Sequence, residues 1–378
     1  MPVDEQTRLR LTTALLQQGI EDGLHLGAQL YVSRHSEAVA DLAIGEARIG
    51  VPMTTDSLNL WFSATKAVTA VAAAQVWERG GFVLDDLVMK YIPEFGQGGK
   101  EAITIRHILT HTGGFRFYKH VEFETDWTTT IAAVCAASLE RGWLPGRKAG
   151  YHQGSSWYIL GEMVRRLDGR PFDQYVREEI FLPLGMTDCW IGMPPAQYQA
   201  YGERIGYLYR TEEGGAERGE FWNSERECAS VRPGGNGHGP MRQFVRLYEA
   251  LLGGGELGGK HILKPVTVAA ITARHRTGMY DVSFKHVLDY GLGLILDSKM
   301  YGLETVPYNY GRHCSPRTFG HSGYQSSAAF ADPEFGLAVA LYCNGLPGDE
   351  WHNRRFRDLL SAIYDDLGIR WEQHQPSS

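Results

Sequence analysis

Ser63 stands three residues before Lys66, at the start of an alanine-rich run, residues 67–79, that is typical of a helix. Residues three apart on a helix lie on one face, so the hydroxyl and the amine can meet. A hydroxyl becomes a nucleophile when a base takes its proton, and a lysine held neutral can be that base. The pair therefore indicates a serine nucleophile activated by a lysine. The ordinary alternative is that Ser63 caps the helix and Lys66 lies on its surface.

Two later segments add groups suited to the same chemistry. Tyr151 follows the loop residues 145–150, where its phenol could carry a proton as a second acid or base. Residues 320–324 read Gly-His-Ser-Gly-Tyr and precede a predicted strand. Glycine would let the backbone approach a substrate closely here, and an amide of an edge strand could donate into an oxyanion hole.

The composition limits the classes of function. The chain has 378 residues, 43% of them hydrophobic, and a formal net charge of -7, which fits a large core and argues against a nucleic-acid surface. The polar N-terminal residues lack the apolar segment of a secretory signal, and no apolar run is long enough to span a membrane. We therefore expect a cytoplasmic protein without nucleic-acid or membrane partners. The five scattered cysteines form no Cys-x-x-Cys pair and predict free thiols. We expect no metal and no cofactor.

The predicted elements describe an α+β protein. Their order is a helix near 5–22, a hairpin of strands 27–33 and 38–45, a block of helices that includes 158–167 and 242–252, strands 290–296, 327–331 and 337–343, and a helix near 353–367. Strands from both ends should form one antiparallel sheet with the terminal helices packed on it. We predict a discontinuous sheet domain, residues 1–62 and 285–378, and a mostly helical domain, residues 63–284, with the active site at their junction.

With these segments, the chain resembles the serine β-lactamase-like superfamily, in the branch of class C β-lactamases, family VIII carboxylesterases, D-aminopeptidases and transacylases. The similar segments run in family order along nearly the whole chain: the nucleophile motif at 62–66, a Leu-His-Thr-Ser-Gly-like loop at 108–115, a Tyr-x-Asn-like motif at 151–153, a family signature at 182–188, residues 290–293, and a Lys-Thr-Gly-like motif at 321–323. The resemblance implies a β-lactamase-like (DD-peptidase-like) fold, in which an antiparallel sheet is flanked by terminal helices and carries an inserted, mostly helical lobe.

The resemblance also implies roles for single residues. Ser63 would attack a carbonyl and form an acyl-enzyme, while Lys66 and Tyr151 would share the proton. The backbone amides of Ser63 and Tyr324 would form the oxyanion hole. The positions expected to face the substrate are Gln153, His321, Ser322, Gly323, Phe115 and His152. For Phe115 and His152, core packing is the alternative to shaping an acyl pocket or tuning Tyr151.

Two positions depart from the family pattern. Gln153 replaces an asparagine and keeps an amide on a stem one methylene longer. His321 replaces a lysine, and a histidine is mostly neutral at pH 7, so the charge that can hold a substrate carboxylate is lost. The resemblance links such His-x-Gly variants with esterases, transacylases and D-aminopeptidases. Esters or thioesters are therefore the favoured substrates.

Two competing patterns are weaker. Residues 320–323 can be compared with the Gly-x-Ser-x-Gly elbow of α/β-hydrolases, but the second glycine comes one position early. His107 and His111 are four apart and could share a helix face, but no glutamate stands between them as in the zinc motif of that spacing.

The sequence thus predicts a serine hydrolase or acyltransferase that acts through acyl-Ser63 on a carboxylic ester or thioester. Its partner would be a small-molecule acyl substrate, which could be bound to a carrier. Two alternatives stay open: an amidase or peptidase of the D-aminopeptidase or weak β-lactamase kind, and a catalytically silent, penicillin-sensor-like binding protein. The oligomeric state is not predicted.

Overall fold

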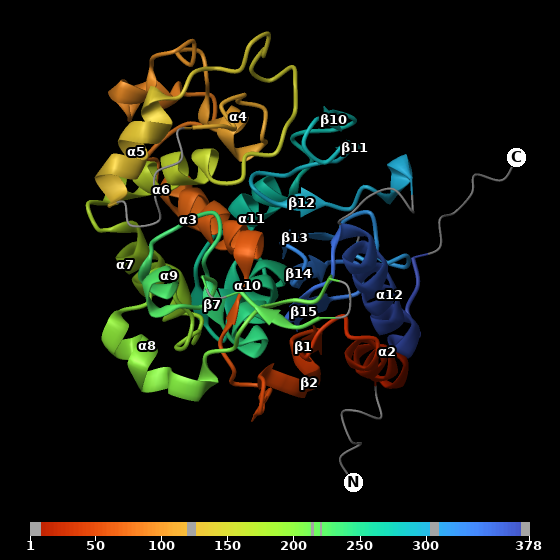
Figure 1. The fold of residues 1–378 in the computed structure, drawn as a ribbon. Coiled ribbons are helices and arrows are strands. Elements are labelled where there is room, and N and C mark those ends of the chain that lie inside the picture. The colour runs from red at the N-terminus through yellow and green to blue at the C-terminus, as the bar shows by residue number, and fades with distance from the viewer. Residues whose placement is uncertain (1–8, 119–125, 213–214, 220, 303–309, 372–378) are drawn as a thin grey trace, which may run out of the picture.

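A seven-stranded antiparallel sheet joins the two ends of the chain in this computed structural model, which describes residues 9–118, 126–212, 215–219, 221–302 and 310–371. Figure 1 shows the N-terminal strands beside the C-terminal ones. The strands, in their order across the sheet, are β12 Ile295–Leu296, β13 Phe319–Gly323, β14 Ser327–Asp332, β15 Leu337–Cys343, β1 Gly27–Arg34, β2 Glu37–Arg48 and β3 Val51–Pro52. The predicted α+β, β-lactamase-like fold with a sheet built from both ends is confirmed.

Strand β15 is buried on both faces because a core lies on each side of the sheet. Its side chains alternate, so Ala338, Ala340 and Tyr342 enter one core cluster, and Leu337, Val339, Leu341 and Cys343 enter the other. The second cluster also holds residues of the terminal helices α2 Arg10–Glu21 and α12 Asp349–Leu367, which contact each other. The uninterrupted apolar run 337–343 is thus explained by burial on two faces.

The middle of the chain supplies a block of helices. These are α3 Lys66–Glu78, α4 Ile105–Leu109, α5 Trp127–Ala136, α6 Ser155–Asp168, α7 Phe172–Val176, α8 Pro195–Tyr201, α9 Glu225–Ala229, α10 Met241–Leu252 and α11 Pro265–Thr272. Helix α3 is buried from Lys66 to Val76 and contacts α6, α7, α11 and β13, so it is the central helix of the block. Its many alanines let these neighbours approach on every side. Within the described ranges, none of the helices combines the length and the apolar character of a membrane span.

Short strand pairs connect the larger elements. They are β4 Asn59–Leu60 with β7 His238–Gly239, β5 Tyr209–Arg210 with β6 Glu217–Arg218 and β16 Gly345–Leu346, β8 Glu256–Leu257 with β9 Lys260–His261, and β10 Tyr280–Asp281 with β11 His286–Val287. The β4–β7 pair matters for the site, because it lies directly before the turn that carries Ser63.

Some predicted elements differ from the structure. Residues 290–296 were expected as one strand, but Tyr290 pairs with Ile295 across a tight turn in which Gly293 has a φ of 83°. Only Ile295–Leu296 joins the sheet, because a turn this tight needs a positive φ that glycine permits. The predicted helix 353–367 begins earlier, at Asp349. Helix α10 lies within residues 63–284 but packs on β14, β15 and β1, so the division into two domains stays a prediction.

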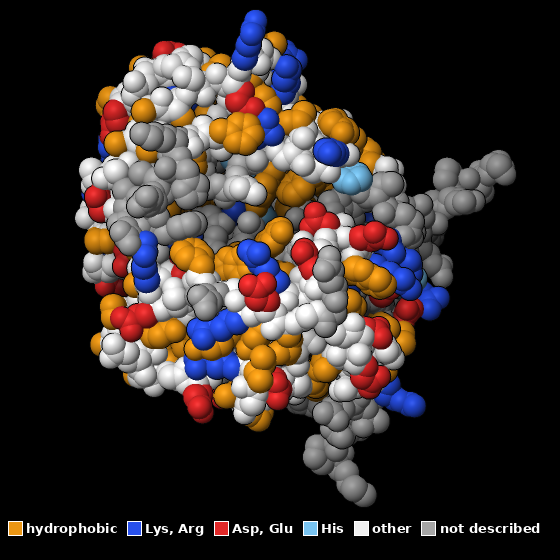
Figure 2. Space-filling view, in the orientation of Figure 1, with side chains coloured by type: hydrophobic (Ala, Val, Ile, Leu, Met, Phe, Trp, Pro, Cys, Tyr) orange, Lys and Arg blue, Asp and Glu red, His pale blue; other side chains and the backbone are white. Residues whose placement is uncertain are grey.

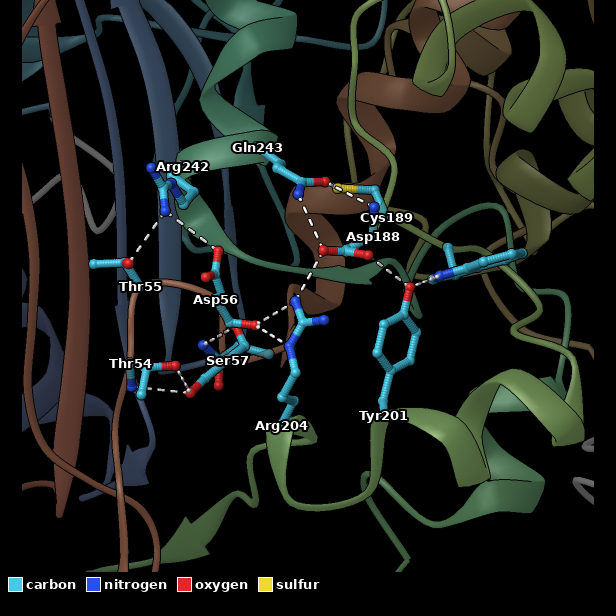
Figure 3. Close-up of polar contacts among 12 residues, drawn as sticks. Thr54, Thr55, Asp56, Ser57, Asp188, Cys189, Tyr201, Arg204, Arg242 and Gln243 are labelled. Atoms are coloured by element: carbon cyan, nitrogen blue, oxygen red, sulfur yellow. Dashed lines mark hydrogen bonds and ion pairs between the residues drawn. The ribbon is translucent and has the colours of Figure 1, made fainter.

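A polar network fastens the loop that leads to β4 and the turn with Ser63 (Figure 3). Asp188, in the predicted family signature, accepts hydrogen bonds from Tyr201 Oη at 2.9 Å and Arg204 Nη2 at 2.8 Å. Gln243 of α10 joins the network by accepting the backbone N–H of Asp188 at 2.8 Å. Arg204 also donates to the carbonyl oxygen of Asp56, at 3.0 Å. The network therefore ties the loop before β4 to helices α8 and α10.

Candidate active site

Ser63 and Lys66 meet where a 3₁₀ turn, Phe62–Thr65, passes into helix α3. The Nζ atom of Lys66 lies 3.0 Å from Oγ of Ser63. Ser63 lines a cleft, whereas Lys66 is completely buried. Phe62 has a φ of 46°, a left-handed backbone that is rare for a bulky residue and costs about 1–3 kcal/mol. Its ring packs edge-on against Trp222 and Tyr324, which helps to hold the turn.

The environment of Lys66 favours its neutral form. Burial lowers the pKa of Lys66 well below its usual value. Its amine donates to the carbonyl oxygen of Gly234 at 2.6 Å and lies 5.1 Å from the centre of the Tyr151 ring. Within the described residues no carboxylate forms an ion pair with Lys66. An amine in this state can take the proton of Ser63.

A loop that the sequence analysis did not single out, residues 230–237, contacts Lys66 and the residues around it. Thr69 Oγ1 donates to the carbonyl of Pro233 at 2.5 Å, and the N–H of Gly237 donates to Thr65 Oγ1 at 2.8 Å. Asn236 fixes the loop from inside, because its Oδ1 accepts the N–H of Arg232 at 3.0 Å. The Pro-Gly-Gly-Asn-Gly composition signals a turn, but nothing in it indicates that the turn contacts Lys66.

Tyr151 is clamped by the segment that joins β10 to β11. Its N–H donates to Oδ1 of Asp281 at 3.1 Å, and its carbonyl accepts from Ser283 Oγ at 3.3 Å. Its ring packs against those of His111 and Phe284, with centroid distances of 4.8 and 4.7 Å. Both the backbone and the ring of Tyr151 are therefore held, with the ring beside the Lys66 amine.

Asp281 is a site residue that the sequence analysis missed. It is fully buried and forms an ion pair with the buried Arg276, with Nη1 and Oδ2 3.1 Å apart. Its Oδ1 also accepts the N–H groups of Ser283 and Phe284, at 2.9 and 3.2 Å. Arg276 in turn donates to the carbonyl of Thr110, one residue before His111. One buried ion pair thus ties together the two segments that enclose the Tyr151 ring.

His111 and His152 are buried, neutral hydrogen-bonding groups. His111 Nδ1 accepts the N–H of His152 at 3.0 Å, in a backbone conformation with a φ of 57° at His111. His152 Nε2 accepts the N–H groups of Gly114 and Phe115, at 3.1 and 3.2 Å. Burial lowers the pKa of His152 to about 3 and that of His111 well below its usual value.

Phe115 and His152 were expected to face the substrate, but they lie elsewhere. Phe115 is fully buried against the rings of Phe95 and His152, and His152 points at the loop 114–115. Neither lines the cleft, whereas Phe117 and Tyr118, two and three residues further on, do. The physical reason is that two buried backbone N–H groups require an acceptor, which His152 supplies.

Strand β13 lies directly against the 3₁₀ turn that carries Ser63. A Cβ at Gly323 would lie 2.1 Å from the carbonyl oxygen of Trp61, so only glycine fits there. Ser327 of β14 donates to the same carbonyl at 2.8 Å. Tyr324 follows the strand and lines the cleft next to Phe62. This close contact is compatible with backbone amides of Ser63 and Tyr324 serving one oxyanion, which stays a prediction.

His321 lies behind Tyr151 rather than in the cleft wall. Its ring centroid is 6.2 Å from that of Tyr151, and its Nδ1–H donates to the carbonyl of Ser322 at 2.8 Å. Burial lowers the pKa of His321 to about 3. Ser322 Oγ is also buried. At this position the protein therefore has a neutral imidazole and not a cation.

The cleft that contains Ser63 has a volume of about 1460 Å³ and opens at the surface (Figure 2). Gln153 is exposed in its wall, and its contact with a substrate stays a prediction. The wall is rich in aromatic rings, among them Phe62, Phe117, Tyr118, Tyr158, Trp222 and Phe284. A cleft of this size and character can hold a bulky apolar acyl group or alcohol.

The histidines at the metal-like spacing have structural partners. His107 Nδ1 accepts the N–H of Thr104 at 3.2 Å and so completes the cap of α4, while His111 binds His152. Among the described residues, no group of three or more potential ligands comes together for a metal ion.

Comparisons with known proteins cover nearly the whole chain. The family model described as Beta-lactamase matches residues 12–363. The Esterase/beta-lactamase LipL of Mycobacterium tuberculosis is 26% identical over 354 residues, which cover 85% of this chain and 77% of that protein. A putative D-alanyl-D-alanine carboxypeptidase of Escherichia coli O157:H7 is 26% identical over 376 residues, covering 89% and 82%. The crystal structure of a family VIII carboxylesterase superimposes with a TM-score of 0.80 at 26% identity, covering 97% of this chain and 98% of the other.

Proposed function

Because this chain belongs to the Beta-lactamase family, we propose that it is a serine hydrolase or acyltransferase that forms an acyl-enzyme on Ser63. The proposed substrate is a carboxylic ester or thioester. The observation that carries this proposal is the 3.0 Å contact between Ser63 Oγ and the buried amine of Lys66, at the wall of an open cleft.

In the first half of the proposed reaction, Ser63 Oγ bonds to the carbonyl carbon and its proton passes to the neutral amine of Lys66. The backbone N–H groups of Ser63 and Tyr324 would stabilise the negative oxygen of the tetrahedral intermediate. The bond to the leaving group then breaks, and that group takes the proton from Lys66, directly or through the phenol of Tyr151.

In the second half, water or an alcohol attacks the acyl-Ser63 ester. The attacking group gives its proton to the same Lys66 and Tyr151 pair, and the Ser63 oxygen recovers a proton as the acyl product leaves. Water gives hydrolysis and an alcohol gives acyl transfer. The cleft has room for an acceptor beside the acyl group, which is why both outcomes stay within the proposal.

The preference for esters and thioesters rests on His321. A neutral histidine, buried behind Tyr151, offers no positive charge to a substrate carboxylate. The aromatic rings in the cleft wall can contact an apolar acyl group or alcohol. LipL, which is named as an esterase as well as a β-lactamase, supports the same choice.

A second candidate is an amidase or peptidase. The similarity to a putative D-alanyl-D-alanine carboxypeptidase favours it. The two candidates differ in the leaving group, since an amine must be protonated before it departs, whereas an alcohol or thiol of lower pKa leaves more easily. Turnover of p-nitrophenyl butyrate, a D-alanyl anilide and a chromogenic cephalosporin would rank them, and faster turnover of the cephalosporin would contradict the ester preference.

Labelling tests the catalytic proposal against a silent, binding-only protein. The full chain is incubated with a fluorophosphonate and its intact mass is measured, with Ser63→Ala as the control. We expect one adduct on the wild-type protein and none on the variant. A folded wild-type protein that gains no adduct would contradict the proposal.

A further inference from the structure

Three loops next to the cleft form one continuous surface, which we call the lip: residues 116–117, 140–150 and 280–287. Arg116 ties them together, because its Nη1 donates to Ser283 Oγ at 2.8 Å and its Nε donates to Glu140 Oε1 at 2.8 Å. The N–H of Val282 also donates to the carbonyl of Ala149 at 3.1 Å. The lip is therefore a fixed part of the fold.

The lip exposes large apolar side chains. Phe117 is 70% exposed, Leu144 62%, Tyr280 55% and Val282 44%. These side chains come from neighbouring parts of the lip. A Cβ at Gly150 would touch Trp143, Val282 and Arg116, so these three side chains lie close together. The Arg116 guanidinium in turn lies 4.9 Å from the Phe117 ring centre. Tyr280 and Val282 point outward because strand side chains alternate, and Asp281 between them points inward to Tyr151.

The same surface is basic, although the whole chain has a net charge of -7. Arg141, Arg147, Lys148 and Lys285 are exposed, and none of the four forms an ion pair with any residue in the described ranges. The acidic residues of the lip are both engaged, Glu140 with Arg116 and the buried Asp281 with Arg276. Figure 2 shows blue and orange side chains gathered along the upper edge of the cleft.

We propose that the lip docks on an anionic lipid surface. Protruding apolar side chains can enter the boundary between headgroups and acyl chains, and lysine and arginine side chains around them can contact lipid phosphates. A basic, apolar patch on an acidic protein is complementary to such a surface, whereas the rest of the molecule would be repelled by it. Neither a spanning helix nor a lipid anchor is needed for contact of this kind.

Docking through the lip would bring the cleft to the lipid. Phe117 and Phe284 belong both to the lip and to the cleft wall, so the entrance lies at the docking face. In a consequence that rests on the proposed function, the enzyme would take esters with long acyl chains directly from the surface. The lipid contact itself needs no turnover, so it can be tested separately.

The test is flotation of the full chain with vesicles of phosphatidylglycerol and phosphatidylcholine, compared with vesicles of phosphatidylcholine alone. A double variant, Leu144→Ser with Tyr280→Ser, removes apolar side chains from the lip. A triple variant, Arg141→Ser with Arg147→Ser and Lys148→Ser, removes positive charges from it. The matched control is Ile49→Ser, which changes a side chain that is 66% exposed on the turn from β2 to β3, at the far end of the molecule from β10 and β11 (Figure 1). Thermal unfolding verifies that every variant is folded.

We expect the wild-type chain and the Ile49→Ser control to float with the anionic vesicles only, and each lip variant to lose about tenfold or more in partitioning. Salt at about 0.5 M should weaken the wild-type contact. The inactive Ser63→Ala chain should float like wild type, which separates this proposal from the proposed function. Wild-type protein that does not float with anionic vesicles, or lip variants that float as well as wild type, would overturn the proposal. The proposal would also be overturned if the wild-type chain bound no lipid but formed a dimer, and the lip variants were monomers.

Discussion

The backbone N–H of Tyr151 donates a hydrogen bond of 3.1 Å to Asp281, a residue 130 positions further along the chain. The same carboxylate pairs with buried Arg276, which donates to the carbonyl of Thr110, next to His111, whose ring packs against that of Tyr151. The orientation of the proposed proton carrier is therefore set by a buried ion pair outside the motifs that identify the family.

Asp281→Asn should reduce kcat by about 10- to 100-fold with little change in KM, because a phenol displaced by a fraction of an ångström transfers protons poorly. It should also lower the free energy of unfolding by about 3 kcal/mol, since Arg276 would keep a buried charge without its partner. Steady-state kinetics with p-nitrophenyl butyrate and urea unfolding measure the two effects.

The matched control is Asp289→Asn. Asp289 is another buried carboxylate, which pairs with Arg274 at 2.5 Å and accepts the backbone N–H of Gly278 at 3.0 Å. The Asp289→Asn variant should have a lower free energy of unfolding, while its kcat should stay within about twofold of the wild-type value. Equal losses of kcat in the two variants would mean that Asp281 acts only through general stability.

The activity should fall as the pH is lowered through the pKa of Lys66, because protonation removes the base. Burial sets this pKa well below the usual lysine value, so the acidic limb of kcat/KM should lie well below pH 10. The limb should be absent from the residual activity of Lys66→Ala. An acidic limb unchanged in Lys66→Ala would assign the titration to another group.

Lys66→Met should stabilise the protein at pH 7 by about 1–2 kcal/mol while leaving only residual turnover. The unfolded chain binds a proton at this lysine that the folded chain does not, so wild-type stability rises with pH up to the unfolded pKa of about 10.4. The advantage of the variant should therefore shrink as the pH increases towards that value. Thermal unfolding across the pH range measures the stability difference between the two proteins. A variant that is less stable than wild type at pH 7 would contradict the claim that burying Lys66 destabilises the protein.

Gly323→Ala should strongly reduce the activity, although it adds only a methyl group. The added Cβ would lie 2.1 Å from the Trp61 carbonyl oxygen and would push β13 away from the 3₁₀ turn that carries Ser63. We expect kcat to fall about 100-fold or more, because the proposed oxyanion donors would separate. Gly215→Ala is the control, since the nearest atom to its Cβ would be 3.8 Å away. Retained activity in Gly323→Ala would argue against an oxyanion hole formed with Tyr324.

Gln153 and His152 are neighbours in sequence, but we expect Gln153 to face the substrate and His152 to stabilise the fold. Single alanine variants should distinguish the two roles. Gln153→Ala should raise KM or change substrate preference without loss of stability, because Gln153 is exposed in the cleft. His152→Ala should lower the free energy of unfolding by about 2–4 kcal/mol, because two buried N–H groups lose their acceptor. A stable His152→Ala protein with an altered substrate preference would restore a direct role for His152.

The local parts of the site could be predicted from sequence. The contact of Ser63 with Lys66 follows from helical spacing alone, and the strands at 27–34 and 337–343 follow from their apolar, β-branched content. The family resemblance added Tyr151 and the motif at residues 321–323, but the strand β13 that carries this motif was not predicted. These features depend on neighbours in the chain or on motifs that keep their order.

The parts that could not be predicted depend on distant pairs. Gly234 reaches Lys66 across 168 positions, and neither Asp281 nor Asn236 stands in a pattern that specifies its partner. The expectation for Phe115 and His152 failed for a related reason. Which side of a loop faces the cleft depends on the hydrogen-bonding needs of buried backbone groups, and these become visible only in the folded chain.

The central claim is that Ser63 is acylated, and trapping the intermediate tests it most directly. The full chain is mixed with p-nitrophenyl butyrate, quenched with acid during turnover, and analysed by intact and peptide mass spectrometry. We predict a mass increase of one butyryl group on the peptide that contains Ser63, and its absence in Ser63→Ala. Turnover by wild-type protein with a butyryl group on another residue, or equal turnover by Ser63→Ala, would contradict the claim.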